Sequence, residues 1–335
     1  MGSSDTSAPS PAPEDFLRIF RTREDAGGAM TFARFMELAL YDPAVGYYRH
    51  PRTRVGYGQG TDFFTASTSA PLFGELIAAA CIDLLRKENP RDYAFVEIGA
   101  EPARGVMSGV SHPFGSVRAA GVGEALDLRG RCVVFSNELF DAQPFRRFVF
   151  RGGAWREFGV TLRGGRLAMV ELPEAAPATL PPAAVEGQLF DAPTGAAALT
   201  AEIAAQPWVG LFVACDYGRT FRELAENYPA GTARAYHRHA QSNDLLARPG
   251  EQDLTCHICW DWLTEILSAR GFSAVTLESQ EAFLVHHAAT LLAKLTAAEA
   301  ERLSPKKRSL LQLLHPAHLG QKFQVLHAFR GEIPG

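Results

Sequence analysis

The chain has 335 residues, of which 47% are hydrophobic and 21% charged, enough to bury the cores of about two domains. Its 33 Lys and Arg against 37 Asp and Glu give a net charge of −4, which argues against a general nucleic-acid-coating role. The sequence has no run of about 18 apolar residues, so no membrane span is predicted. Five cysteines, an odd number, do not suit a disulfide framework and indicate a reducing compartment.

Residues 1–12 are small, polar and Pro-containing, which predicts a disordered N-terminus. They contain no apolar segment, and no Arg precedes Arg18, so we expect neither a secretory signal nor a mitochondrial presequence. The expected location is cytoplasmic, and the size of the chain favours an enzyme.

Residues 13–92 are predicted to form an N-terminal helical and lid region. Helices are expected after Pro13 and after Thr31, and a longer one over 71–88, where apolar residues recur every four positions. The Gly- and aromatic-rich segment 46–65 cannot be regular helix and predicts a long loop, either a lid or a surface crossing.

Three short apolar runs predict buried strands of a parallel sheet, at 93–98, 131–135 and 209–215. Each run ends in polar or glycine residues, and open α/β sheets bind ligands at the carboxyl ends of their strands. Glu97, Glu138 and Asp216 stand at these three ends and could line one acidic crevice. Any one of these acids could equally be a helix cap or a turn former. That explanation is weaker when it has to account for all three acids together.

An antiparallel β-insertion is predicted at about 145–190, because strand-like stretches alternate around the pairs Gly152-Gly153 and Gly164-Gly165. The Pro- and Ala-rich stretch 173–187 predicts a loop leading out of it. The remainder of residues 93–335 is expected to complete an α/β, Rossmann-like core. Its later elements are predicted as a helix at 260–270, a strand at 273–278, helices to about 314 and a closing strand at 323–330.

The strand end Glu97-Ile98-Gly99 is a weak sign of a nucleotide- or S-adenosylmethionine-binding half, because it lacks the G-x-G-x-x-G spacing. Glu101 would place negative charge beside a phosphate, and Pro102 removes an amide donor. A sulfonium cofactor has no phosphate and tolerates acids nearby. The segment therefore favours methyl transfer over NAD chemistry.

Several long blocks resemble the MidA family of S-adenosylmethionine-dependent methyltransferases. They are TFARFMELALYDPAVGYY, GTDFFTAS with FGELIA, VVFSNELFDAQPFRRFV, the DYG at 216–218, RAYHRH with PGEQDLTCHI, and HPAHLGQKFQVL. The resemblance extends from about Met30 to Leu326. That family includes the mitochondrial complex I assembly factor that methylates an arginine of a core subunit.

The resemblance implies S-adenosyl-L-methionine as cofactor and a protein side-chain nitrogen, arginine in particular, as acceptor. It implies catalytic roles for Glu138 and Asp141, which would orient a guanidinium, although Asp141 could equally cap the next turn. The implied cofactor-binding residues are Glu97, Gly99, Asn137, Asp62 and Thr65. We expect a protein substrate, with a respiratory-complex subunit as one candidate, and no nucleic-acid partner. The strand edges of the β-insertion could pair in a homodimer.

The segment after Gly99 departs from the family, which reads like E-L-G-P-G-R-G-T where this chain reads EIGAEPARGV. Ser136 follows Gly99 by only 37 positions, which leaves little room for two further strands and helices. Glu124 stands near the usual spacing of a ribose-binding acid; otherwise that acid is missing. The alternative function is a catalytically degenerate relative that acts as a binding or assembly protein.

No metal site is expected. Cys256 and Cys259 have CxxC spacing without a second such pair and are predicted to be ordinary helix-face cysteines. His286-His287 and the pair His315 and His318 could suggest metal, but no neighbouring carboxylate completes a ligand pattern in the sequence.

Overall fold

The computed structural model describes residues 13–50, 71–100, 105–175, 177, 179–299 and 304–331. The predicted disordered N-terminus, residues 1–12, lies outside this part of the chain. The chain divides into two compact units, each made of three segments: 1–52, 144–194 and 224–256 in unit 1, and 53–143, 195–223 and 257–335 in unit 2. Among the helices described, none has the length and hydropathy of a membrane span.

Unit 1 begins with the two helices that the sequence predicts. Pro13 precedes the first, whose Glu14 and Asp15 stand in the first turn, where they complement the helix dipole. Thr31 caps the second by accepting a hydrogen bond from the amide of Arg34. The helices are α1 (Glu14–Arg23) and α2 (Phe32–Tyr41), followed by the 3₁₀ turn η1 (Tyr47–Arg49).

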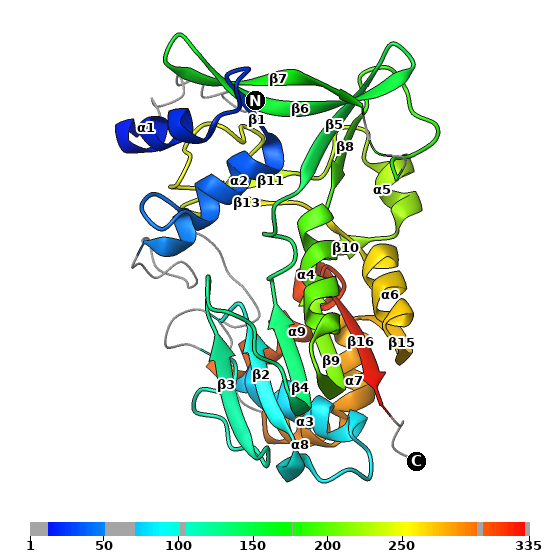
Figure 1. Cartoon of the computed structure of the whole chain (residues 1–335). Helices are drawn as coiled ribbons and strands as arrows, with labels where there is room; N and C mark the ends of the chain where they lie inside the picture. The colour runs from blue at the N-terminus through cyan, green and yellow to red at the C-terminus, as the bar shows by residue number, and fades with distance from the viewer. Residues whose placement is uncertain are drawn as a thin grey trace. The chain divides into compact units, whose positions relative to one another are not determined.

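The antiparallel insertion is confirmed as a sheet built on two tight hairpins (Figure 1). Gly152-Gly153 and Gly164-Gly165 form two-residue turns with φ of 57° and 77°, and of 56° and 78°, which glycine adopts without strain. The strands run in the order β1-β6-β5-β8, with β7 also paired to β6. They are β1 (Ala29–Thr31), β5 (Arg146–Arg151), β6 (Ala154–Arg163), β7 (Arg166–Ala175) and β8 (Leu189–Ala192).

A second, three-stranded sheet in unit 1 has the order β12-β11-β13. It consists of β11 (Arg234–His237), β12 (Ala240–Ser242) and β13 (Asp253–Thr255). The Tyr48 hydroxyl donates a hydrogen bond of 2.9 Å to Asp253, which ties this sheet to the segment after α2. One of the points where the chain passes between the units falls inside α5 (Phe221–Asn227).

Unit 2 contains a six-stranded sheet in the order β15-β16-β9-β4-β2-β3. The four strands from β9 to β3 are parallel, and β16 runs antiparallel to both of its neighbours. The strands are β2 (Ala94–Ile98), β3 (Ser116–Ala120), β4 (Gly130–Asn137), β9 (Trp208–Asp216), β15 (Phe272–Ser279) and β16 (Gln324–Arg330). A short parallel pair joins β10 (Gly218–Arg219) to β14 (Ile258–Cys259).

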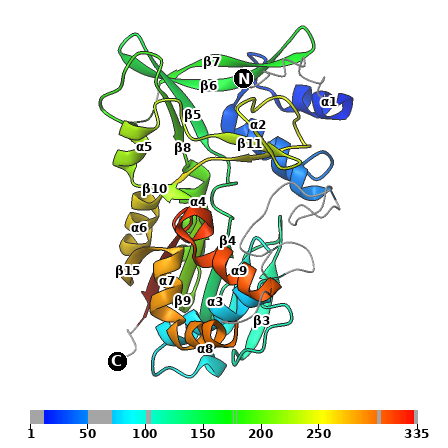
Figure 2. The same ribbon diagram turned by 180° about the vertical axis from the view of Figure 1, so that it is seen from behind.

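Helices cover both faces of this sheet, because its central strands are apolar on both sides. Figures 1 and 2 show the two layers from opposite sides. One layer consists of α4 (Thr194–Ala205) and α6 (Trp260–Ala269). The other consists of α3 (Leu72–Leu84), α7 (Gln280–His287), α8 (Ala289–Glu299) and α9 (Pro305–Leu314), with the turns η3 (Pro90–Asp92) and η4 (Pro316–Gly320) nearby in the chain.

The structure differs from the sequence expectation at several elements. The helix predicted over 71–88 ends at Leu84, because Arg86 has a φ of 54° that a helix cannot contain. Strand β3 and helix α4 were not predicted: the first is a short exposed edge strand, and the second is an Ala-rich segment with little amphipathic contrast.

All five cysteines are buried and free. Cys259 belongs to β14 and precedes α6, so the placement of the CxxC pair on a helix face was wrong. Burial raises the pKa of the Cys259 thiol to about 12, which removes the thiolate that redox chemistry requires.

A buried ion pair anchors unit 1. The Asp191 carboxylate, on β8, pairs with Arg147 of β5 and accepts hydrogen bonds from the amides of Thr232 (2.7 Å) and Ala233 (2.8 Å). The carboxylate is fully buried, and the side chain of Arg147 is 12% exposed. Removing one partner of such a pair leaves an uncompensated buried charge.

We therefore expect Asp191→Ala to lower the free energy of unfolding by about 3–5 kcal/mol, measured by urea denaturation. Glu171→Ala is the matched control, since Glu171 forms a half-exposed pair with Arg151, and its loss should cost less than about 1 kcal/mol. Equal effects of the two substitutions would contradict the anchoring role.

Candidate active site

The carboxyl ends of β2, β3, β4 and β9 meet at one edge of the sheet in unit 2. Such an edge is the usual ligand-binding place in an open α/β fold. The acids predicted at the strand ends, Glu97, Glu138 and Asp216, are all placed at this edge. The site is therefore built from the ends of neighbouring strands within a single unit.

Glu97 is buried near the end of β2 and accepts a hydrogen bond of 2.6 Å from the amide of Val106. A Cβ added to Gly105 would lie 3.0 Å from the same carboxylate. The burial of Glu97 raises its pKa to about 7, a rise that the bond from Val106 only partly offsets. Near neutral pH this group therefore exists in both protonation states.

Gly99 follows β2 with a φ of 79°, and its amide donates to Ala120 at the end of β3 (2.8 Å). A Cβ at this position would meet Leu139 at 2.6 Å. The glycine is required both by its backbone conformation and by the close approach of the segment after β4.

The segment after β4 folds tightly around the Asp216 carboxylate from the end of β9. Its Oδ2 atom accepts hydrogen bonds from the amides of Phe140 (2.8 Å) and Asp141 (3.4 Å), while Oδ1 accepts one from the amide of Tyr217 (2.8 Å). Asp216 is completely buried, and this burial raises its pKa despite the opposing effect of the amide hydrogen bonds. A buried carboxylate thus fixes the loop that follows the neighbouring strand.

Asn137 and Glu138 occupy the point where this loop leaves β4. Glu138 has a φ of 51°, an unfavourable conformation for a non-glycine residue, and its amide donates to Cys215 (2.9 Å). Its carboxylate accepts hydrogen bonds from the Asn137 side-chain amide (3.1 Å) and the Tyr217 hydroxyl (3.5 Å). Strained residues held by their surroundings are frequent at functional sites.

The side-chain oxygen of Asn137 is buried and has no hydrogen-bond partner among the described residues. A buried acceptor without a donor costs free energy, so native proteins seldom leave one unless a ligand or water supplies the donor. This oxygen therefore marks a position where a ligand with N–H or O–H groups can bind.

Glu124 lies in the turn after β3, the strand next to β2, where it accepts a hydrogen bond of 3.1 Å from the amide of Gly121. The side chain is exposed. Because β3 is hydrogen-bonded to β2, the short segment between Gly99 and Ser136 retains the strand after which a ribose-binding acid is expected. In the described part of that segment, residues 105–129, β3 is the sole regular element.

Of the other predicted site residues, the structure describes Asp141, whereas Asp62 and Thr65 lie outside the described residues. The Asp141 side chain is buried, and no helix follows it within residues 138–145. Tyr217 was missed as a site residue; its position directly after the third apolar run, in the DYG sequence, was the available signal.

The donor and acceptor chemistry of this edge fits S-adenosylmethionine. That molecule presents an ammonium group, two ribose hydroxyls and a sulfonium, all of which favour acceptor or anionic neighbours. The edge offers carboxylates at Glu97, Glu124 and Glu138 and the unpaired oxygen of Asn137. It offers no pattern suited to phosphate among the described residues.

Comparison with known proteins supports this assignment. Residues 118–277 match the model of a family described as "Putative S-adenosyl-L-methionine-dependent methyltransferase". The protein arginine methyltransferase NDUFAF7, mitochondrial, of Mus musculus is 23% identical over 386 aligned positions, which cover 92% of this chain and 82% of that protein. The Rattus norvegicus protein of the same name gives the same identity and coverage.

Solved structures agree over nearly the whole chain. A crystal structure of a Burkholderia thailandensis protein bound to S-adenosyl-homocysteine has a TM-score of 0.86 and 25% identity, covering 98% of this chain and 96% of that one. A native crystal structure from the same organism has a TM-score of 0.81 and 24% identity, with the same coverage. Fold and site thus define a Rossmann-like, S-adenosylmethionine-dependent methyltransferase. More narrowly, the chain resembles the MidA-like family of these enzymes, and the family model matches residues 118–277.

The raised pKa of Glu97 makes stability depend on pH. Since its pKa is about 7 in the folded protein and 4.5 ordinarily, the folded state binds more protons between these values, and its stability falls as pH rises through this window. We expect Glu97→Gln, which keeps an acceptor for Val106, to remove about 2–3 kcal/mol of the difference in unfolding free energy between pH 4.5 and pH 8. Urea denaturation of both proteins at the two pH values measures this; parallel pH profiles would contradict it.

Proposed function

We propose that this protein transfers the methyl group of S-adenosylmethionine to a side-chain nitrogen of a protein, with arginine as the preferred acceptor. The observation that carries the proposal is the strained Glu138, whose carboxylate is positioned by Asn137 and Tyr217 at the carboxyl edge of the sheet. The relatives named protein arginine methyltransferase support the choice of arginine.

The cofactor would supply an electrophilic methyl group: the acceptor nitrogen would attack the methyl carbon as the carbon–sulfur bond breaks, S-adenosylhomocysteine would leave, and the nitrogen would lose a proton to a carboxylate or to solvent. An arginine side chain is protonated in water, with a pKa above about 12, and its charge is delocalised over the planar guanidinium. A carboxylate that accepts hydrogen bonds from this group orients it and localises its charge away from the attacking nitrogen. Glu138 is half-buried, at the carboxyl edge of the sheet.

Asp141 is proposed as the second carboxylate of the acceptor site. It is buried, and its amide belongs to the turn that Asp216 holds, so its position is coupled to that of Glu138. Glu97, Gly99, Glu124 and Asn137 are proposed to bind the cofactor. Glu124 would accept hydrogen bonds from the ribose hydroxyls. The side-chain oxygen of Asn137 would accept a hydrogen bond from an N–H or O–H group of the cofactor.

Separate binding and transfer measurements test these roles. We expect S-adenosylmethionine and S-adenosylhomocysteine to bind the purified full chain at micromolar concentrations in calorimetric titrations. Glu138→Gln should leave both affinities within about threefold and lower methyl transfer at least about 100-fold, since a positioned charge of this kind is worth roughly 3 kcal/mol in a transition state. Glu124→Gln should weaken cofactor binding about tenfold, the value of one lost hydrogen bond, and leave transfer at saturating cofactor unchanged.

The transfer assay uses methyl-labelled cofactor and a library of peptides with a central arginine. Each peptide has two matched versions in which lysine or glutamine replaces that arginine. Hydrolysis and mass spectrometry of the labelled products identify the acceptor nitrogen. Glu265→Gln, which changes an exposed carboxylate on α6, is the control for a general charge effect. Label found only on lysine would reject the arginine assignment. A folded protein that binds neither ligand would support the alternative, a degenerate relative that acts as a binding or assembly protein.

A further inference from the structure

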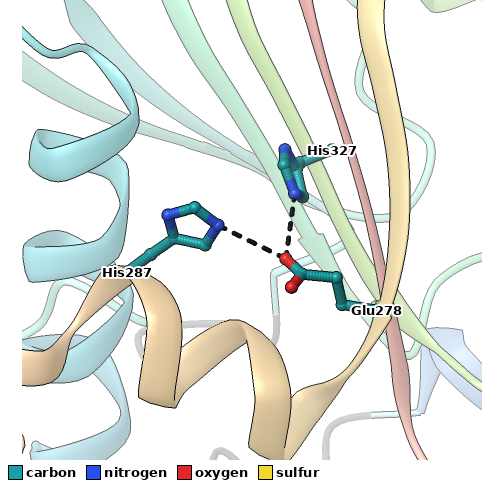
Figure 3. A group of neighbouring side chains, drawn as sticks. All are labelled: Glu278, His287 and His327. Atoms are coloured by element: carbon teal, nitrogen blue, oxygen red, sulfur yellow. Dashed lines mark hydrogen bonds and ion pairs between the residues drawn. The ribbon is translucent and has the colours of Figure 1, made fainter.

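A cluster of imidazoles and carboxylates lies at the β15–β16 side of the sheet in unit 2, on the face that α3 and α7 cover. Glu278 and His327 are diagonal neighbours on β15 and β16: Thr276 is paired with His327, and Glu278 is paired with Val325. His287 approaches from the last turn of α7, the helix that follows β15. Figure 3 shows the three side chains pointing toward one another.

The distances within this cluster match the spacing of ligands around one small cation. The Glu278 Oε2 atom lies 3.2 Å from His327 Nε2 and 3.3 Å from His287 Nε2. The ligand atoms of all three residues lie within 4.8 Å of one another. A tetrahedral Zn²⁺ ion with bonds of about 2.0–2.1 Å separates its ligands by about 3.3 Å.

The second nitrogen of His287 strengthens this interpretation. Its Nδ1 atom lies 3.0 Å from Asp83 Oδ2, at the end of α3, so carboxylate oxygens face both ring nitrogens. A neutral imidazole has a single N–H and can satisfy only one of them. With a metal ion on Nε2, the ring donates its one N–H to Asp83, which is the carboxylate–histidine–metal arrangement of known zinc sites.

The surroundings hold these rings in place and leave room for a further ligand. The ring of Phe283 packs against His287 at 5.3 Å and against His327 at 5.7 Å. A cavity of about 390 Å³ is lined by the three cluster residues and also by Arg86, Thr276 and His286. His327 and Glu278 are 9% and 13% exposed and His287 is 21% exposed, so an ion can reach a largely desolvated position.

We propose that Glu278, His287 and His327 bind one Zn²⁺ ion, with Asp83 orienting His287 and the fourth ligand position facing the cavity. The ligand set, two imidazoles and one carboxylate, is one that zinc accepts with an open position. The ion would join β15, β16 and α7 and so stabilise the C-terminal part of unit 2.

Metal titration of the full chain tests the proposal. The protein is expressed without a polyhistidine tag, since such a tag binds the same ions, and is stripped with a chelator before calorimetry with ZnCl₂. We expect one Zn²⁺ per chain with micromolar or tighter affinity and a melting temperature that rises by a few degrees. Substitution with Co²⁺ should give the visible absorption of a tetrahedral complex.

Variants locate the ion. Glu278→Gln and His287→Gln should each weaken binding at least 100-fold, and Asp83→Asn about 10–100-fold, the usual effect of an outer-shell partner. His239→Gln is the control, because this exposed histidine lies in unit 1, outside the cluster; the affinity of this variant should stay within about threefold. Circular dichroism checks that each variant is folded. Absence of saturable binding to the unmodified chain, or equal affinity in the folded Glu278→Gln variant, would overturn the proposal.

Discussion

The Asp216 carboxylate controls the geometry of the proposed active site. Buried at the end of β9, it accepts backbone amides from the loop after the neighbouring strand, at Phe140 and Asp141, and from Tyr217. These bonds determine where the loop turns, and the turn determines where Glu138 and Asn137 stand. Without this buried acceptor the amides would be unsatisfied, and the strained conformation of Glu138 would relax.

In the shortened half of the sheet, a backbone amide likewise fixes the position of a buried carboxylate, Glu97 of β2. In the described residues 105–115, turns follow the first strand of this half, and the amide of Val106 satisfies Glu97 directly. Val106, Met107 and Val110 contribute to the hydrophobic core on that face, together with α3. The short segment has few regular elements, but it still packs one face of the sheet. It also leaves an edge rich in hydrogen-bond acceptors, so it can still form part of a ligand site.

The two clusters of ionisable groups in unit 2 differ in what satisfies their charges. At the carboxyl edge, backbone amides and a tyrosine hydroxyl surround the carboxylates, and the Asn137 side-chain oxygen has no donor in the part of the chain that the structure describes. Around Glu278, imidazole nitrogens surround the carboxylate, and both ring nitrogens of His287 face carboxylate oxygens, of which a neutral ring can donate to only one. The first arrangement suits a ligand with hydrogen-bond donors, and the second suits a metal ion.

The sequence by itself determined the hairpins, through Gly152-Gly153 and Gly164-Gly165, and the central parallel strands, through their uniformly apolar runs. Both signals are local: a turn requires particular backbone angles, and a strand covered on both faces requires apolar residues throughout. Only the tertiary structure decided that β3 pairs with β2, because an exposed edge strand has no strong hydrophobic pattern. It also placed Glu278 beside His287 and His327, since β-sheet register and helix docking join residues that no sequence spacing connects.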